Sequence, residues 1–219
     1  MKEKIYVKKI IYILLAIGFI FFFPHLGIIP IPFGYAIVIT VAAWLFLKTT
    51  HENFSDLGFS FKRFESKAIV IGAIAAVLIF VFLQYLFFPV LNRIIHLEKA
   101  NLDDFKQVRH HVFNYIFFLL LSFLGGGFYE ELIFHGFIFT RLEKIIPGKH
   151  KMPASFLLTN IIFGLYHFQL GTSGVLNAFL AGSAYHAVMI KYNRNLWYSF
   201  FAHGFFDTIA FTYIYLGYW

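Results

Sequence analysis

Long apolar segments, separated by short polar ones, run through the whole chain. Most approach the roughly 20 residues that a helix needs to cross a bilayer. We therefore expect an all-α, polytopic membrane protein whose residues 1–219 form a single transmembrane helical domain. The glycines at 125–127 are expected to kink or break the fourth helix, and Pro153 suits the start of the fifth. About seven transmembrane helices in one bundle are predicted, at residues 8–25, 32–47, 68–91, 112–140, 153–169, 174–190 and 196–216.

The basic residues between these segments predict the orientation. With the N-terminus on the inner side, the inner segments hold fourteen of the 18 Lys and Arg residues. Loops on the cytoplasmic side of a membrane carry such an excess. We expect a multi-pass protein of the cell membrane with a cytoplasmic N-terminus. The first apolar run is too long for a signal peptide and lacks a cleavage site, so we expect it to be retained.

Composition supports the bilayer as the main partner. Hydrophobic residues make up 60% of the 219 residues and charged ones 13%, whereas a soluble domain carries about 25% charged residues. The basic residues of the predicted cytoplasmic loops explain the net charge of +7. Nucleic-acid binding is not predicted, because the sequence has no basic cluster interleaved with aromatic residues. The chain has no cysteine, which excludes disulfides and thiolate chemistry.

Several ionisable residues lie inside the predicted spans. Such groups are costly at membrane depth, and they face a bundle interior or a water-filled cavity. Because Glu130 and Glu131 are adjacent, they should point about 100° apart and do different work. His203 and Asp207 share one helix face, as do Glu131 and His135. The full set is Glu130, Glu131, His135, His167, His186, His203 and Asp207.

These side chains suit hydrolysis by an activated water molecule. A carboxylate or a histidine can take the proton of water, a second histidine can donate to an oxyanion, and Asp207 can fix the tautomer of His203. No Gly-x-Ser-x-Gly motif is present. Zinc bound by Glu130, His167 and His203 is the competing interpretation, although the helical His-Glu-x-x-His pair is absent. His186 alone is better explained as an interhelical hydrogen-bond donor.

Three motifs in order resemble the CAAX protease and bacteriocin-processing family (the CPBP or Abi family) of intramembrane proteases. The family pattern is Glu-Glu-x-x-x-Arg, then Phe-x-x-x-His, then His-x-x-x-Asn or Asp. Here the three read "EELIFHG", "FGLYH" and "HGFFD", and the resemblance covers a core at about residues 112–210. The stretch "NFSDLGFSF" at 53–61 also looks like a juxtamembrane segment of the family.

The resemblance implies a role for each matching residue. Glu130 would be the general base, His167 would assist it, His203 and Asp207 would bind the developing oxyanion, and Glu131 would support the site. The implied substrate is a peptide or a membrane protein. The family has been classed with metalloproteases, but no cofactor is required on the preferred interpretation, and a divalent metal such as zinc is the alternative.

One residue departs from the family pattern, since His135 stands where the family has arginine. A histidine is neutral much of the time near neutral pH, so it would compensate the two carboxylates less than arginine would. This favours a second hypothesis, a catalytically inactive member acting as a bacteriocin self-immunity or regulatory scaffold protein. A transporter is a third and weaker hypothesis. Intramembrane acidic residues also serve in proton relays, but the sequence lacks the internal repeat that many transporters have.

Overall fold

A computed structural model describes residues 2–31 and 33–219, with side chains from residue 7 onward. Every regular element among these residues is helical, and no strand occurs, so the all-α prediction is confirmed. The α-helices are α1 (Lys2–Phe22), α2 (Gly34–Thr49), α3 (Lys67–Val81), α4 (Phe88–Ile95), α5 (Val112–Leu121), α6 (Phe139–Ile145), α7 (Lys151–Tyr166), α8 (Gly171–Lys191) and α9 (Leu196–Leu216).

Two pairs of these helices are joined without a break by π-helical turns. The segment η4 (Phe82–Phe87) joins α3 to α4, and η6 (Ser122–Ile138) joins α5 to α6. The protein thus has seven continuous helical segments over its described residues, which is compatible with the predicted spans. Four are long and apolar enough to cross a membrane, namely Val7–Leu26, Lys67–Ile95, Val112–Ile145 and Phe168–Lys191.

The glycines at 125–127 do not break the fourth segment; they lie within the π-helical η6. Pro153 lies in the first turn of α7, as expected for a helix start. His167 was predicted inside the fifth span, but it is the residue that follows the end of α7 at Tyr166.

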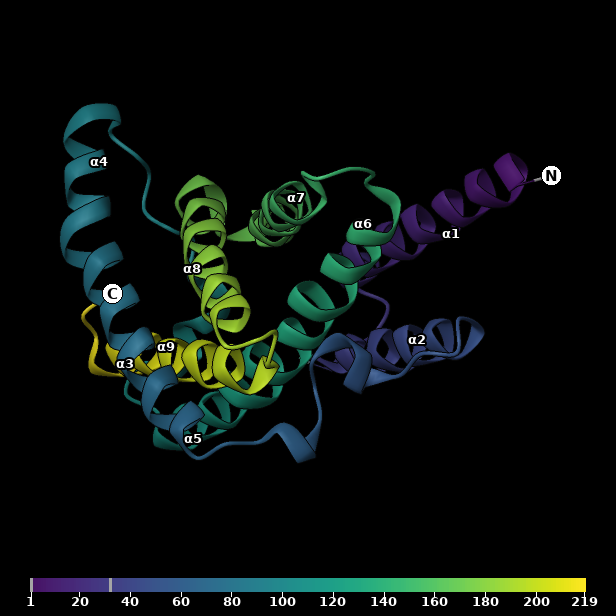
Figure 1. Ribbon diagram of the computed structural model, residues 1–219. Coiled ribbons are helices and arrows are strands. Elements are labelled where there is room, and N and C mark those ends of the chain that lie inside the picture. The colour runs from purple at the N-terminus through teal and green to yellow at the C-terminus, as the bar shows by residue number, and fades with distance from the viewer. Residues whose placement is uncertain (1, 32) are drawn as a thin grey trace.

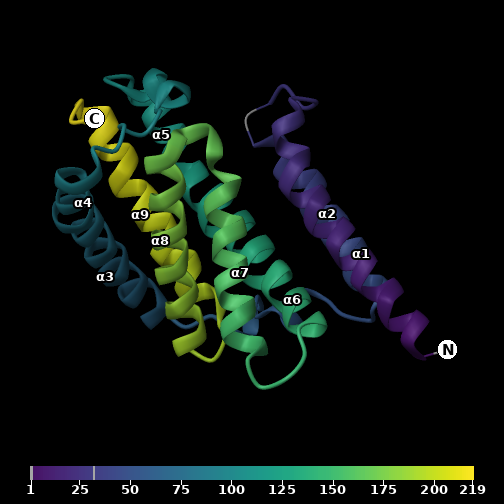
Figure 2. The same cartoon turned by 90° about the horizontal axis from the view of Figure 1, so that it is seen from above.

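Helix α9 lies at the centre of the packing. It contacts α3, α5, α8 and η6, while α7 packs against α8 on the other side (Figures 1 and 2). Close approach depends on small residues: a Cβ added at Gly72 of α3 would lie 2.4 Å from the Cβ of Phe201 on α9. Helices α1 and α2 lie on the side of the bundle away from α4 (Figure 2).

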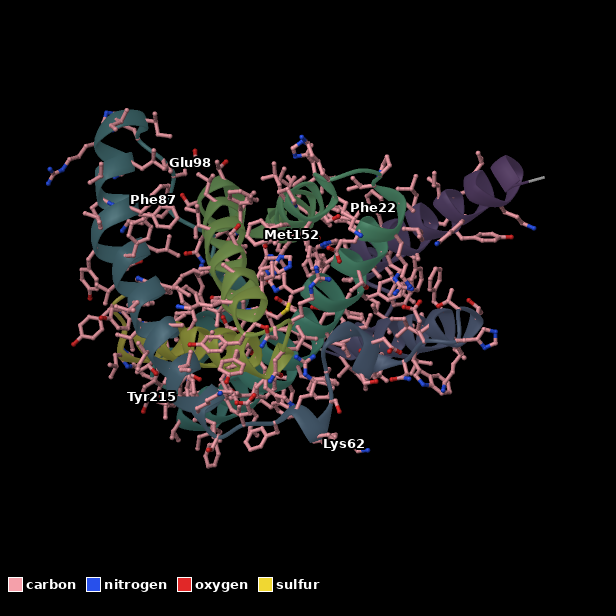
Figure 3. All side chains as sticks on the ribbon, viewed as in Figure 1. Phe22, Lys62, Phe87, Glu98, Met152 and Tyr215 are labelled. Carbon is pink, nitrogen blue, oxygen red and sulfur yellow. The ribbon has the colours of Figure 1, made fainter. Side chains whose placement is uncertain are left out.

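Apolar side chains cover the outside of the protein as well as its core. Phe22 of α1 is 63% exposed, for example, and it and Phe87 are labelled in Figure 3. Lys62, by contrast, lies in the polar connection between α2 and α3 (Figure 3). Exposed apolar surface on this scale suits a lipid environment rather than water.

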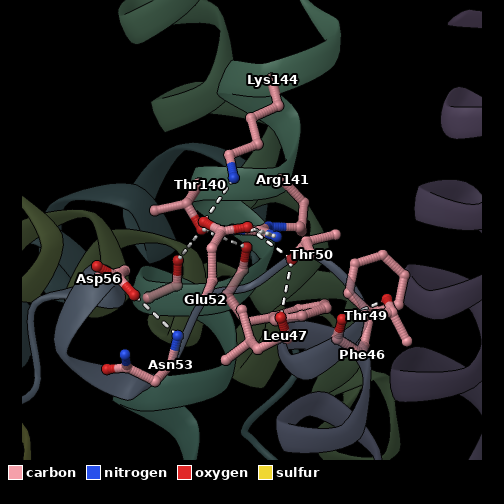
Figure 4. Close-up of polar contacts among 12 residues, drawn as sticks. Phe46, Leu47, Thr49, Thr50, Glu52, Asn53, Asp56, Thr140, Arg141 and Lys144 are labelled. Carbon is pink, nitrogen blue, oxygen red and sulfur yellow. Dashed lines mark hydrogen bonds and ion pairs between the residues drawn. The ribbon is translucent and has the colours of Figure 1, made fainter.

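An ion cluster in which only Arg141 is fully buried joins the end of α2 to α6 (Figure 4). Arg141 donates from Nη1 and Nη2 to the two carboxylate oxygens of Glu52, at 2.8 and 2.9 Å, and Lys144 donates to Oε1 at 2.5 Å. Burial raises the pKa of Glu52, but hydrogen bonds from Arg141, Lys144 and Thr50 outweigh this and lower it to about 2. This cluster fixes α6, which continues from η6, against the loop after α2.

The "NFSDLGFSF" segment holds the start of α9. Asn53 caps a short helical turn, and the carbonyl of Gly58 accepts a hydrogen bond from the backbone N–H of Leu196 at 3.2 Å. Trp197 donates from its ring to the carbonyl of Ser60 at 2.9 Å. The segment thereby fixes the helix that carries His203 and Asp207.

Candidate active site

Buried polar side chains from three helical segments meet inside the bundle. Glu130, Glu131 and His135 come from η6, His167 follows α7, and His203 comes from α9. Four of these five are at most 6% exposed, and only His167 is half-buried. Asp207, one turn further along α9, is also half-buried.

Glu131 contacts two histidines of this cluster, one through each carboxylate oxygen. Its Oε2 accepts a hydrogen bond from Nδ1 of His135 at 2.7 Å, and its Oε1 accepts one from Nδ1 of His203 at 2.9 Å. The side chain of Glu131 is 1% exposed. A buried carboxylate is stable only when it is paired and hydrogen-bonded, and Glu131 is paired on both oxygens.

Glu130 faces two histidines without a direct hydrogen bond to either. Its Oε2 lies 3.7 Å from Nε2 of His167 and 3.8 Å from Nε2 of His203. Separations above about 3.5 Å between polar atoms suit a bridging water molecule. Asp207 Oδ2 lies 3.6 Å from the same nitrogen of His203, so Glu131, not Asp207, makes the hydrogen bond that orients this imidazole.

The backbone sets the tautomer of His167. Its Nδ1 lies 2.8 Å from the carbonyl oxygen of Phe163, which only accepts, so Nδ1 carries the hydrogen. In the neutral ring Nε2 is then an acceptor that faces Glu130. A water molecule between the two side chains can donate one hydrogen to each.

The π-helical winding changes the expected relation of the two glutamates. The N–H of Phe139 bonds to the carbonyl of Phe134, five residues earlier. A turn closed in this way holds more residues than an α-turn, so adjacent side chains rotate by less than about 100°. The two carboxylates therefore approach opposite nitrogens of the same His203 ring.

A second polar chain runs from His135 into the bundle. Nε2 of His135 lies 3.2 Å from Oδ1 of Asn160, whose Nδ2 donates to the carbonyl of Phe156 at 2.8 Å and lies 3.1 Å from Nδ1 of His186. His135 and His186 also stack, with ring centroids 4.6 Å apart. His186 is thus an interhelical hydrogen-bonding residue, as expected, but it accepts rather than donates.

The orientation of the Asn160 amide indicates which ring nitrogens of His135 face hydrogen-bond acceptors. The carbonyl of Phe156 can only accept, so Nδ2 of Asn160 faces it and Oδ1 faces His135. Both nitrogens of His135 therefore face acceptors, Glu131 on one side and Asn160 on the other. An imidazole that donates from both nitrogens is the cationic form.

Sequence reasoning missed Asn160. It precedes His167 by seven residues, which is two helical turns on one face, and the available signal was a polar residue in an apolar segment. Its partner could not be identified, because the contact crosses from α7 to η6.

The described side chains do not form a metal site in this arrangement. Among them, no group of three or more His, Asp or Glu is placed so that it could hold a metal ion. Glu130 and the two histidines nearest to it remain the predicted ligand set, but no chemical step is assigned to a metal here.

Residues 112–209 match the family model described as Rce1-like, type II CAAX prenyl endopeptidase Rce1-like. This confirms the resemblance to the CAAX protease family that the three motifs indicated. No curated protein and no solved structure matches the chain significantly.

Proposed function

We propose that this protein, whose residues 112–209 are Rce1-like, hydrolyses peptide bonds with a water molecule activated by Glu130 and His167. The family match and the apolar helices indicate a membrane protein with a CAAX-endopeptidase kind of function. The observation that carries the finer proposal is the position of the Glu130 carboxylate, within 4 Å of imidazole nitrogens from two other helical segments.

In the proposed reaction, water donates one hydrogen to Glu130 and the other to His167. As the water oxygen attacks the substrate carbonyl carbon, Glu130 takes a proton and later gives it to the leaving nitrogen. Nε2 of His203, carrying a hydrogen, donates to the oxygen that becomes negative. Glu131 stabilises the positive charge on His203 through Nδ1. Asp207 lies beside Nε2 and contributes negative charge to the same ring.

The inactive scaffold is the second candidate, favoured by His135 at the position of the family's arginine. The hydrogen bonds around His135 weaken this objection, because two acceptors favour a ring that is charged as arginine is. The two hypotheses differ in Glu130, which a scaffold does not need and an endopeptidase does.

Gly126 gives a test of site geometry. A Cβ at this position would lie 2.4 Å from Oδ2 of Asp207 and 3.0 Å from Nε2 of His203. We expect Gly126→Ala to lower hydrolysis by on the order of tenfold to 100-fold, because it displaces these side chains. Gly18→Ala is the control, since nothing lies within 4 Å of its added Cβ. Equal peptide-cleavage rates for both variants would contradict the proposed site.

The proposed function is tested by assaying purified protein on peptide and membrane-protein substrates, with and without a metal chelator. Because water is activated by side chains in the proposal, we expect cleavage at the same rate in both conditions. A zinc protease in the same detergent is the positive control for chelation. Activity that is lost with chelator and restored by zinc would contradict the proposed mechanism and support the metal hypothesis.

A further inference from the structure

A crevice of about 1090 Å³ lies between α1, α2 and the segment where η6 continues into α6. Its walls are apolar, formed on α1 by residues such as Ile13 and Phe19 and on α2 by Ala42 and Phe46. Glu130, Glu131, His167 and His203 do not line it, so it is separate from the candidate active site. We propose that this crevice binds an anionic phospholipid, with the phosphate at its charged end and an acyl chain along its apolar walls.

The charged end of the crevice carries an excess of positive groups. Lys8 and Lys9 of α1 and Arg141 and Lys144 of α6 line it, and Glu52 is the carboxylate that lines it among the described side chains. Arg141 is 1% exposed, and its Nε has no hydrogen-bond partner among the described residues. Glu52 already binds three donor atoms of Arg141 and Lys144. The remaining positive charge is available to an anionic group.

The surroundings of the crevice identify the ligand as an amphiphile. The outer faces of both helices are apolar, with Ile11 and Leu15 on α1 and Val41 and Leu45 on α2 all exposed. The crevice therefore opens toward the hydrocarbon of the bilayer and not toward water. A ligand with one negative head and an apolar chain matches both parts, and phospholipids of the membrane supply that chemistry.

The membrane side fits the same ligand. The four cations of the crevice belong to the segments predicted to face the cytoplasm, where anionic lipids are concentrated. A phosphate held there would link α1 to α6, which continues from the helix that carries both glutamates. The proposal does not depend on the proposed peptidase activity, since it concerns binding alone.

The test is titration of the purified full chain with dioleoyl phosphatidylglycerol, followed by native mass spectrometry. Lys8→Gln/Lys9→Gln removes two charges that are exposed and free of carboxylate partners in the described structure. We expect it to weaken phosphatidylglycerol binding by about tenfold or more, because two positive charges near the phosphate are lost. Ala42→Trp, which fills the apolar wall, should weaken it as well. Dioleoyl phosphatidylcholine should bind all forms weakly and equally.

Lys149→Gln/Lys151→Gln is the matched control, because it removes two exposed charges from the same predicted side of the membrane but outside the crevice. Equal weakening in this control would show delocalised surface charge and overturn the proposal. Unchanged lipid binding in Lys8→Gln/Lys9→Gln, with weaker binding of a lipidated peptide, would identify a substrate tail instead. An unchanged melting temperature in neutral micelles establishes that each variant is folded.

Discussion

Replacing Glu130 by glutamine is expected to lower peptide hydrolysis by about 100-fold to 10,000-fold, the usual contribution of a general base. Glutamine has nearly the same shape, but it cannot take a proton from water. Glu130 makes no direct hydrogen bond to His167 or His203, at 3.7 and 3.8 Å, so its loss should leave the helices in place. The measurement is the initial rate of cleavage by purified protein, with the melting temperature recorded beside it.

Glu98→Gln is the matched control, since it makes the same chemical change at an exposed position far from the site in sequence. It should retain full activity. Retained cleavage in the Glu130 variant would rule out Glu130 as the base. Loss of activity together with a lower melting temperature would instead indicate a structural role, which the geometry assigns to Glu131 and not to Glu130.

The sequence predicted the helical fold because apolar length and loop charge are local properties of the chain. It also drew attention to the residues that meet in the site, since each places an ionisable group in an apolar segment. Glu130, His167 and His203 come from distant parts of the sequence, and Oε2 of Glu130 lies within 4 Å of a nitrogen of each histidine. No local sequence pattern predicts these distances. Burying each ionisable group alone would cost free energy, however, so we expected the groups to lie together in the bundle.

Two features could not be read from the sequence, for physical reasons. The directions of Glu130 and Glu131 were inferred from about 3.6 residues per turn, and η6 does not have that period. The partner of His203 was inferred from its own helix as Asp207, whereas Nδ1 of His203 donates its hydrogen bond to Glu131 on η6. Spacing within a helix predicts which residues share a face, but it does not show which neighbouring helix that face meets.

The role of His135 follows from these cross-helix contacts. Its ring is fully buried, and it joins Glu131 of η6 to Asn160 of α7. A neutral histidine has one hydrogen for these two acceptors, which would leave one buried acceptor without a donor, at a cost of about 1 to 3 kcal/mol. We expect the cationic ring, because it has a hydrogen for each acceptor and places a positive charge beside the buried carboxylate. In that form His135 would supply the charge of the arginine in the family pattern, with a shorter reach.

A double-mutant cycle tests this charge. His135→Gln and Glu131→Gln should each reduce the free energy of unfolding by about 3 kcal/mol or more, because each removes one member of a buried ion pair. The double variant replaces the ion pair with two amides that can bond to each other, so it should lose less than the sum of the single losses. We expect a coupling of about 1 to 3 kcal/mol, measured by denaturant unfolding in mixed micelles.

The exposed pair formed by Lys67 and Glu65 provides the comparison. Its atoms are 2.6 Å apart, but the two side chains are 62% and 45% exposed, so a cycle of Lys67→Gln with Glu65→Gln should give little or no coupling. A coupling as small as this between His135 and Glu131 would mean a neutral ring in a hydrogen bond, and the inactive scaffold would regain support. A large coupling, with a greater fall in kcat than rise in KM for His135→Gln, would mean that the charge on His135 holds Glu131, and through it His203, in the position that hydrolysis requires.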